Sequence, residues 1–414
     1  MRSLAAALAA TAAHHPDKPA IRFGGQAISY GALAERVGAA AARLAALGVG
    51  PGDRVAILSL NRPEYLVALF ACARLGAMLL PLNWRLAPAE LAWIAADAAP
   101  RVLLAEAAFA PGLAAMQAAL PEAEALPLED PAALAAAGAV PDAGGPERDA
   151  LLVYTSGTTG RPKGALLTQA ALFANAVMSW HLHAMQPSDV VLSALPFFHV
   201  GGLNIQTTPA LLMGCTVVIH PKFDPAATLA AIPAEGATLM VMVPSTVRAL
   251  TAAPGFASAD LRPMRAMVVG SETVNPAVLA PLTARGIQML QVYGATESCP
   301  IAIYARYGHI PADLACSGHA GLLCAARVVD EAGREVPHGT PGEIELSGPN
   351  IFRGYWQRPD ATAEALHEGW FRTGDIATRD PATGAFTVHD RKKNMIISGG
   401  ENIYPAEVER VLAE

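Results

Sequence analysis

The sequence predicts an α/β protein, in which a large N-terminal domain of helix-covered sheets is followed by a small β-rich subdomain and by the start of a small α+β C-terminal domain. Two observations support this prediction. Uniformly apolar runs of strand length alternate with alanine-rich helical segments, as is typical of parallel sheets that helices cover on both faces. From residue 326 the strand-like runs alternate with polar residues and are separated by Gly and Pro, which favours an antiparallel unit.

The predicted elements follow this pattern along the chain. A strand at 55–60, a helix at 64–75 and a strand at 77–82 come first. Residues 105–148 are rich in Ala, Pro, Gly and acidic residues, which indicates peripheral helices and a loop. Apolar runs then return at 150–153, 165–167, 190–195, 216–219, 239–243, 266–269 and 288–292. The shorter, polar-alternating strands are expected at 327–330, 342–347 and 386–389.

We therefore place the N-terminal domain at 1–389, its β-rich subdomain at 326–389, and the hinge with the beginning of the C-terminal domain at 390–414. Pro405 opens a helical pattern whose apolar face meets no later partner in the sequence. That face is formed by Val408, Val411 and Leu412. The pattern predicts a chain that is cut soon after a new domain begins.

Composition excludes several classes of protein. With 414 residues, 53% of them hydrophobic, the chain is not disordered. A net charge of −7 leaves no broad cationic face for a nucleic-acid backbone. The most apolar stretch, 66–84, is interrupted by Arg74, Gly76 and Pro81, so no membrane span is expected. The 5 cysteines show no C-x-x-C spacing, which argues against disulfides or a zinc site and favours the cytoplasm.

The strongest local signal is the segment 154–164, which reads YTSGTTGRPKG and lies between two apolar runs. Its glycines let backbone amides turn toward an anion, its hydroxyls add hydrogen-bond donors, and Lys163 adds a positive charge. These glycines and hydroxyls belong to Thr155, Ser156, Gly157, Thr158, Thr159 and Gly160. Neither a Walker A loop nor a G-x-G-x-x-G pattern fits. The segment therefore predicts a phosphate-binding loop of another type.

Three further clusters follow later strands. An aromatic pair precedes His199, and such a histidine taken alone is more often structural than functional. The segment 291–297, QVYGATE, puts an aromatic face, a glycine and a carboxylate at the end of a strand, where open α/β sheets bind ligands. Asp375, in a Thr-Gly-Asp turn, could accept two hydroxyl hydrogens of a ribose, although such turns are common.

Taken together and in this order, these segments and the segment 390–405 resemble the adenylate-forming superfamily, which includes acyl-CoA synthetases, firefly luciferases and peptide-synthetase adenylation domains. The resemblance covers nearly the whole chain. In that family a carboxylate attacks the α-phosphate of ATP, giving an acyl-adenylate and pyrophosphate, and a thiol then displaces AMP. The resemblance implies ATP, Mg²⁺ and coenzyme A, with a carboxylic acid as the substrate.

The resemblance also implies roles at the phosphates. It assigns the loop that begins at Thr155 and ends at Lys163 to the β- and γ-phosphates, Thr296 to the α-phosphate and Glu297 to the magnesium ion. Positioning and charge stabilisation are what phosphoryl chemistry needs, so these residue types suit it. The catalytic set that we predict is Lys163, His199, Thr296, Glu297 and Arg391.

For the nucleoside, the resemblance places Tyr293 on adenine and Asp375 on the ribose hydroxyls, with Arg391 at the ribose and phosphate. The purine edge would lie against Gln291 and the backbone of Gly270, Ser271 and Glu272. Lys393 stands at the position of the family's interdomain hinge, and Asn394 follows it where the family usually has an acidic residue.

The acyl pocket is expected to take an acid without an α-amine. Peptide-synthetase domains hold that amine with an aspartate shortly after the aromatic pair, where this chain has His199, and an unpaired buried ammonium is costly. Gly294 stands where short-acid members of the family have a tryptophan, so the pocket floor should be open to a medium or long acyl chain or to an aryl acid such as a cinnamate. The predicted lining is His199, Gly202, Asn204, Gly294 and Cys299.

The sequence thus predicts an ATP-dependent acid–CoA ligase of fatty-acid or aryl-acid metabolism, with a homodimer left open as its assembly. The alternatives are a nucleotide- or acyl-adenylate-binding protein without turnover, and an adenylating enzyme with another acceptor. The family's adenylation lysine lies in the C-terminal domain, which is nearly all absent before the sequence ends at Glu414. We therefore expect ligand binding to survive in this chain and adenylation to be impaired.

Overall fold

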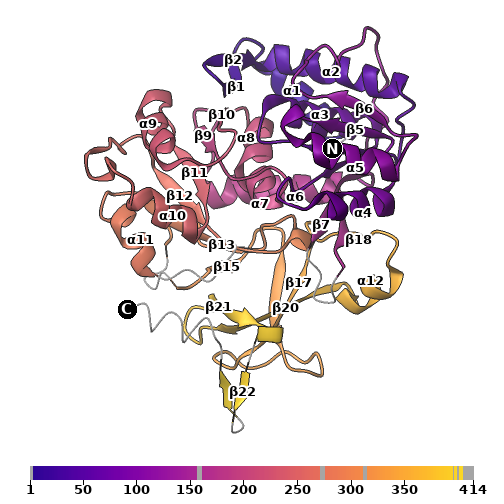
Figure 1. Ribbon diagram of the computed structural model, residues 1–414. Helices are drawn as coiled ribbons and strands as arrows, with labels where there is room; N and C mark the ends of the chain where they lie inside the picture. The colour runs from indigo at the N-terminus through magenta and orange to yellow at the C-terminus, as the bar shows by residue number, and fades with distance from the viewer. Residues whose placement is uncertain are drawn as a thin grey trace.

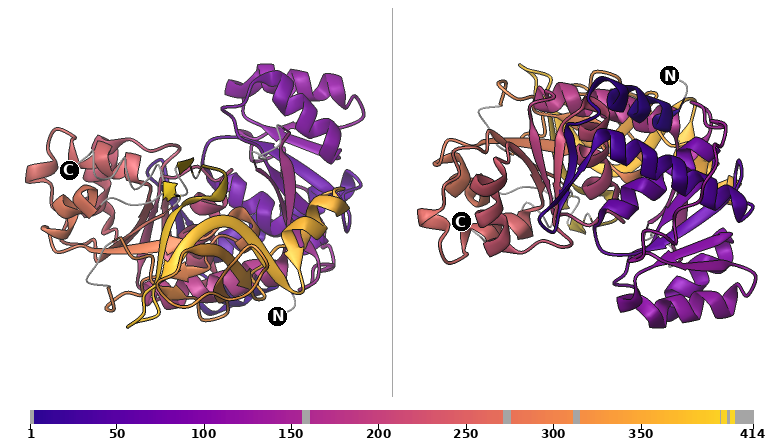
Figure 2. Two further views of the ribbon diagram at one scale, coloured as in Figure 1. Left: turned by 90° about the horizontal axis from the view of Figure 1, so that it is seen from below. Right: turned by 90° about the horizontal axis from the view of Figure 1, so that it is seen from above.

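Two large sheets and a smaller one organise the chain (Figure 1). The computed structural model describes residues 3–155, 161–270, 276–310, 315–394, 396–398 and 401–403. In both further views, the helices between residues 225 and 283 lie at the opposite end of the molecule from the helices between residues 88 and 119 (Figure 2). The β-rich part lies below the two large sheets in the view of Figure 1.

The seven-stranded sheet carries the predicted phosphate-binding segment. Its strands, in spatial order, are β18 (Gly354–Tyr355), β8 (Lys163–Thr168), β7 (Asp149–Thr155), β4 (Met78–Pro81), β3 (Arg54–Leu58), β5 (Val102–Ala105) and β6 (Glu124–Pro127). The strands from β7 to β6 are parallel, whereas β8 and β18 add antiparallel pairs at one edge. The helices α3 (Pro63–Leu75), α4 (Pro88–Ala98) and α5 (Ala110–Ala119) pack against this sheet, and α2 (Tyr30–Ala46) packs against α3.

The helix α3 shows how local sequence sets an element. Pro63 occupies its first turn, where a missing N–H costs nothing, and Gly76 ends it in the left-handed region at φ 68°. Its residues from Pro63 to Ala73 are all buried, so protein covers the helix on every face. The predicted helix at 64–75 and the strands on either side of it are confirmed.

The nine-stranded sheet contains the parallel strands that the apolar runs predict. Its order is β15 (His319–Ala320), β14 (Ile303–Tyr304), β13 (Gln288–Tyr293), β12 (Ala266–Val269), β11 (Leu239–Met242), β9 (Val190–Ser193), β10 (Thr216–Ile219), β1 (Pro19–Phe23) and β2 (Gln26–Ser29). Every pair from β1 to β13 along this order is parallel. The helices α8 (Thr208–Met213), α9 (Pro225–Glu235), α10 (Pro244–Thr251) and α11 (Pro276–Thr283) pack against this sheet. The helix α6 (Gln169–His183) contacts α8 and also β8 of the seven-stranded sheet, and α1 (Leu4–His14) contacts α2, α3 and α8.

The smaller sheet is antiparallel throughout, as its polar alternation predicts. Its strands are β16 (Ala325–Val329), β17 (Gly342–Ser347), β19 (Leu366–His367), β20 (Trp370–Arg379) and β21 (Phe386–Arg391). The helix α12 (Pro359–Ala365) precedes β19, and a hairpin of β22 (Ile396–Ser398) and β23 (Glu401–Ile403) follows β21. The domain boundary at 389 stays a prediction, and the helix expected after Pro405 lies outside the described residues.

One buried histidine at the end of α6 has a clear charge state. The Nδ1 atom of His183 lies 2.7 Å from the carbonyl oxygen of Ser179, which can only accept, so Nδ1 carries the hydrogen. The Nε2 atom then accepts from the side-chain amide of Gln206 at 3.0 Å. Burial lowers the pKa of His183 from 6.5 to about 4, so the folded protein holds it neutral.

This histidine should make the fold sensitive to mild acid. The unfolded chain takes up a proton at His183 below pH 6.5 and the folded one only near pH 4, so stability falls as the pH drops through that window. At pH 5 the loss is roughly 2 kcal/mol relative to pH 8. Urea unfolding at both pH values should show a smaller loss in His183→Asn, while the exposed His14→Asn should behave as the wild type. An equal acid sensitivity in all three proteins would contradict the assignment.

Candidate active site

The start of the phosphate-binding segment is held by a hairpin. Thr155 ends β7 and Lys163 begins β8, and the two residues are paired across the strands, with the Thr155 hydroxyl 3.4 Å from the Lys163 carbonyl oxygen. The residues between them that the prediction names, Ser156 to Gly160, lie outside the described residues. Just before them, the Tyr154 hydroxyl donates to Asp97 at 2.6 Å, and Arg358 donates to the other oxygen of the same carboxylate at 2.7 Å.

Lys163 and Glu297 approach a common residue, Tyr355. Glu297 lies in a short 3₁₀ turn, Thr296–Ser298, directly after β13, and is buried. The Tyr355 hydroxyl donates to its carboxylate at 2.7 Å, and the ammonium of Lys163 lies 5.3 Å from the centre of the Tyr355 ring. The cation thus contacts the ring of one tyrosine and the carboxylate its hydroxyl. A polyphosphate with a divalent cation requires both kinds of charge.

A second group of contacts involves Tyr293, at the end of the strand that precedes Glu297. Tyr293 is the last residue of β13, and its hydroxyl donates to the Asp375 carboxylate at 2.7 Å. Arg391 is paired with Asp375 between β21 and β20, and its guanidinium lies 3.4 Å from the second carboxylate oxygen. Burial raises the pKa of Asp375, against the opposing effects of Tyr293 and Arg391. The structure therefore brings together three residues that the prediction places around a nucleoside.

Gln291 and Gly270 lie on neighbouring strand ends. The side-chain nitrogen of Gln291 is buried and has no hydrogen-bond partner among the described residues. This amide can therefore donate to an acceptor on a ligand. Gly270 follows β12, and a Cβ atom at this position would lie 2.6 Å from the carbonyl oxygen of Val292. The two residues that follow Gly270 in the prediction, Ser271 and Glu272, lie outside the described residues.

His199 lies at an exposed turn among aromatic and basic side chains. It precedes the short helix α7 (Val200–Gly202), and its ring centre is 4.4 Å from that of Phe198. The Arg85 guanidinium lies 5.6 Å from the Phe198 ring centre and 4.9 Å from that of Trp84. The surrounding protein desolvates the His199 ring, which lowers its pKa, and the positive charge of Arg85 lowers it further. The neutral imidazole is therefore favoured.

Three of the predicted pocket residues pack closely against backbone or core. A Cβ at Gly294 would lie 1.8 Å from the carbonyl oxygen of Pro300, so the expectation that this glycine leaves an open pocket floor is wrong: backbone fills that direction. A Cβ at Gly202 would lie 2.3 Å from the carbonyl oxygen of Pro196, which makes Gly202 a close-packing position. Cys299 is fully buried in the core. The spacing along the chain locates these residues without giving the direction in which they point.

Asn204 is buried in the π-helical segment Leu203–Thr207, which continues α7. Both polar atoms of its side chain lack a hydrogen-bond partner among the described residues. Its backbone carbonyl accepts from Asn175, whose own side-chain oxygen accepts from the amide of Ile301 at 3.0 Å. Asn175 therefore ties the segment after His199 to the turn that carries Glu297.

Sequence patterns missed Tyr355, Arg85 and Asp97. Tyr355 belongs to a two-residue strand that reaches β8 from almost 200 positions later in the chain, so no local spacing connects it with Lys163 or Glu297. The side chain of Lys393, predicted as the hinge, lies outside what the structure describes, although the backbone of Lys392–Asn394 forms a 3₁₀ turn. Asn394 donates to Asp390 at 2.9 Å.

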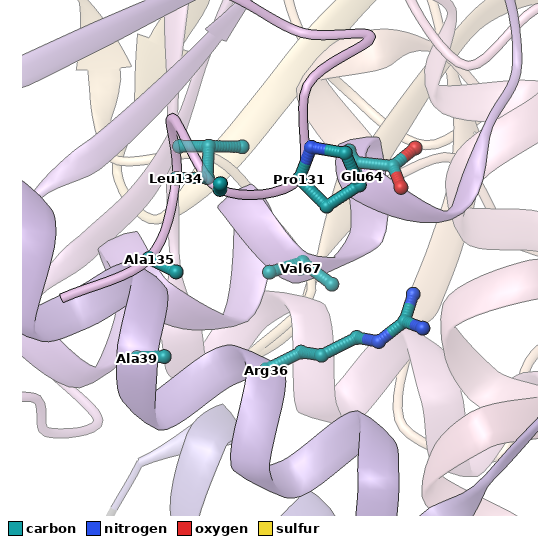
Figure 3. A pocket seen from close by; sticks show the side chains of 8 residues that line it. Arg36, Ala39, Glu64, Val67, Pro131, Leu134 and Ala135 are labelled. Carbon is teal, nitrogen blue, oxygen red and sulfur yellow. The ribbon is translucent and has the colours of Figure 1, made fainter. Parts of the chain in front are cut away.

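Within the described ranges there is no cluster of three or more His, Cys, Asp or Glu side chains arranged to hold a metal ion. All five cysteines are buried, and none of them forms a disulfide bond. No helix among the described residues is long and apolar enough to cross a bilayer. A separate cavity of about 320 Å³ lies between α2, α3 and residues 131–135, where Val67 and Leu134 contribute apolar walls and Arg36 a charged one (Figure 3). It contains none of the predicted site residues.

Comparison with known proteins identifies the family to which this fold and this set of side chains belong. The family model "AMP-binding enzyme" matches residues 8–356, so the chain belongs to the AMP-binding enzyme family. It is 46% identical to an indoleacetate–CoA ligase of Aromatoleum aromaticum over 96% of this chain and 80% of that protein. It is 42% identical to a feruloyl-CoA synthase of an Amycolatopsis species over the same shares of the two chains.

Among solved structures, ATP-bound MatB from Rhodopseudomonas palustris superposes with a TM-score of 0.89 at 33% identity, over 99% of this chain and 82% of that one. The α/β fold that the sequence predicts is therefore confirmed. With relatives of this identity over nearly its whole length, the chain is an acid–thiol ligase of its family.

Proposed function

We propose that this protein activates an aryl-substituted carboxylic acid with ATP and transfers the acyl group to coenzyme A. The observation that carries the choice of an aryl acid is the similarity at 46% and 42% identity to two ligases that are named for indoleacetate and for ferulate. The aromatic side chains of Trp84 and Phe198, which meet at a ring-centre distance of 6.0 Å beside His199, support the same choice.

In this proposal the two groups of contacts hold opposite ends of ATP. Tyr293 and Asp375 receive the nucleoside, where ribose hydroxyls would donate to the carboxylate that Arg391 already faces. The unpartnered amide of Gln291 supports a purine edge nearby. Lys163 lies at the polyphosphate, where its charge stabilises the leaving pyrophosphate. The carboxylate of the acid substrate attacks the α-phosphate from the side of His199.

Glu297 fits the role of a magnesium ligand. Mg²⁺ is usually held by one or two carboxylates together with substrate phosphates, so a lone buried carboxylate beside Lys163 suffices. One of its oxygens accepts from Tyr355 and the other remains for the ion. When bound, the ion supplies charge neutralisation of the phosphates. We also place the protein in the cytoplasm, in line with five cysteines that form no disulfide bond.

Two measurements on the complete protein, which includes the C-terminal domain, test the proposed function. Acid-dependent ATP–pyrophosphate exchange should be faster with indoleacetate or ferulate than with palmitate, and adding coenzyme A should give the aryl-CoA thioester. Stable aryl-adenylate analogues should raise the melting temperature, because binding at 100 times Kd adds about 2.7 kcal/mol to the free energy of unfolding. Analogue binding without exchange would overturn the proposal in favour of a binding protein, and exchange without a thioester would indicate another acceptor. A preference for palmitate would overturn the choice of an aryl acid.

A further inference from the structure

Tyr355 reaches the phosphate end of the site through an edge strand. The strand β18 pairs with β8, so that Tyr355 lies opposite Ala165 and two positions from Lys163. This pairing places the face of the tyrosine ring 5.3 Å from the Lys163 ammonium. Cation–π attraction at this distance holds an ammonium in place without neutralising its charge.

The hydroxyl of the same tyrosine bonds to Glu297. It donates to the carboxylate at 2.7 Å, while the amide of Phe352 donates to the Glu297 carbonyl at 2.8 Å. The Phe352 and Tyr355 rings meet edge to face with centres 4.9 Å apart, which restricts the tyrosine.

Oppositely charged side chains that approach one residue would normally pair with each other. Among the ion pairs of the described residues, Lys163 and Glu297 form none together. A direct pair would occupy both groups and remove them from ATP and its metal ion. The ring and the hydroxyl of Tyr355 instead satisfy the cation and the carboxylate separately, and each keeps its charge available to a ligand.

We propose that Tyr355 is a positioning residue that keeps Lys163 and Glu297 apart and oriented for ATP and its magnesium ion. This inference rests on the proposed function, because it takes Glu297 as the magnesium ligand. It makes the hydroxyl and the ring separable: the hydroxyl orients the carboxylate, and the ring holds the ammonium. Loss of the hydroxyl should weaken the binding of Mg²⁺ in the presence of ATP. Loss of the ring should also weaken the binding of ATP itself.

The test compares Tyr355→Phe and Tyr355→Leu with the wild type by two readouts. The first is the rise in melting temperature caused by ATP, measured without acid or turnover over a series of Mg²⁺ concentrations. The second is exchange activity, with KM for ATP and kcat determined separately. Tyr355→Phe should need about tenfold more Mg²⁺ for half of the ATP-induced rise, since a hydrogen bond to a charged group is lost. Tyr355→Leu should need as much Mg²⁺ and should also raise the KM for ATP.

Tyr304→Phe provides the matched control, because it removes a part-buried tyrosine hydroxyl that bonds to His181 at 2.8 Å elsewhere. It should lower the melting temperature without moving the Mg²⁺ midpoint. A wild-type Mg²⁺ midpoint in Tyr355→Phe, or an equal shift in Tyr304→Phe, would overturn the inference while leaving the proposed function intact. A wild-type protein that ATP fails to stabilise at any Mg²⁺ concentration would overturn the proposed function and this inference together.

Discussion

Replacing Lys163 or Glu297 by alanine in the complete protein should lower the rate of acyl-adenylate formation by about 10²- to 10³-fold, because each change removes one charged contact at the polyphosphate or its metal ion. Acid-dependent pyrophosphate exchange measures this rate. The fold should be retained in Lys163→Ala, since the lysine ammonium contacts a ring face and forms no ion pair with another described residue. In Glu297→Ala the Tyr355 hydroxyl loses its acceptor, so some loss of stability is expected as well.

Lys222→Ala serves as the control for removal of one positive charge, because Lys222 is exposed between β10 and α9. It should leave exchange unchanged. An unchanged exchange rate in both Lys163→Ala and Glu297→Ala would show that neither residue acts at the phosphates, and the assignment of that end of the site would have to be abandoned.

Gly294→Ala should destabilise the protein severely and disturb the site with it. The added Cβ would lie 1.8 Å from the Pro300 carbonyl oxygen and 2.8 Å from the Ser298 hydroxyl, and no rotamer change can relieve a contact with backbone. Overpacking in a well-packed region typically costs about 1–3 kcal/mol, and this contact lies at the upper end or beyond. The shift would fall on the turn between Tyr293 and Glu297, which joins the nucleoside and phosphate contacts.

The matched control is Gly201→Ala, where the nearest atom to an added Cβ is a flexible Ile205 methyl group at 3.8 Å. Melting temperature and exchange should both fall in Gly294→Ala and remain near the wild type in Gly201→Ala. A stable Gly294→Ala protein whose preference moves toward short acids would instead restore Gly294 to the lining of the acyl pocket.

The parallel strands could be predicted because burial on both faces leaves a continuous apolar run, as in β12 and β13. The predicted cluster of Tyr293, Asp375 and Arg391 is also found together, since each stands in a motif of recognisable order. By contrast, β6 was missed because only Leu126 of its four residues is buried. Tyr355 was missed because its partners come from distant strands, and such pairing leaves no local pattern.

The direction of a side chain was the other quantity that the sequence could not supply. Gly294 and Gly202 lie in the predicted segments, but at both positions a side chain would point at a nearby backbone carbonyl oxygen. Only the path of the backbone decides this. The expected roles of His199 and Asn204 stay predictions, although His199 is exposed and the unpartnered amide of Asn204 is compatible with a polar ligand group.

The five buried cysteines have a practical consequence for work with this protein. An alkylating reagent attacks thiolates that it can reach, and burial both covers these sulfurs and raises the pKa of Cys72, Cys215, Cys299 and Cys324. Labelling under native conditions should therefore report opening of the fold and not surface chemistry. A brief pulse of reagent followed by mass measurement would count open molecules directly, even in unpurified samples. Because the five thiols are spread from α3 to the β-rich sheet, the labelled peptides would also show which part opens first.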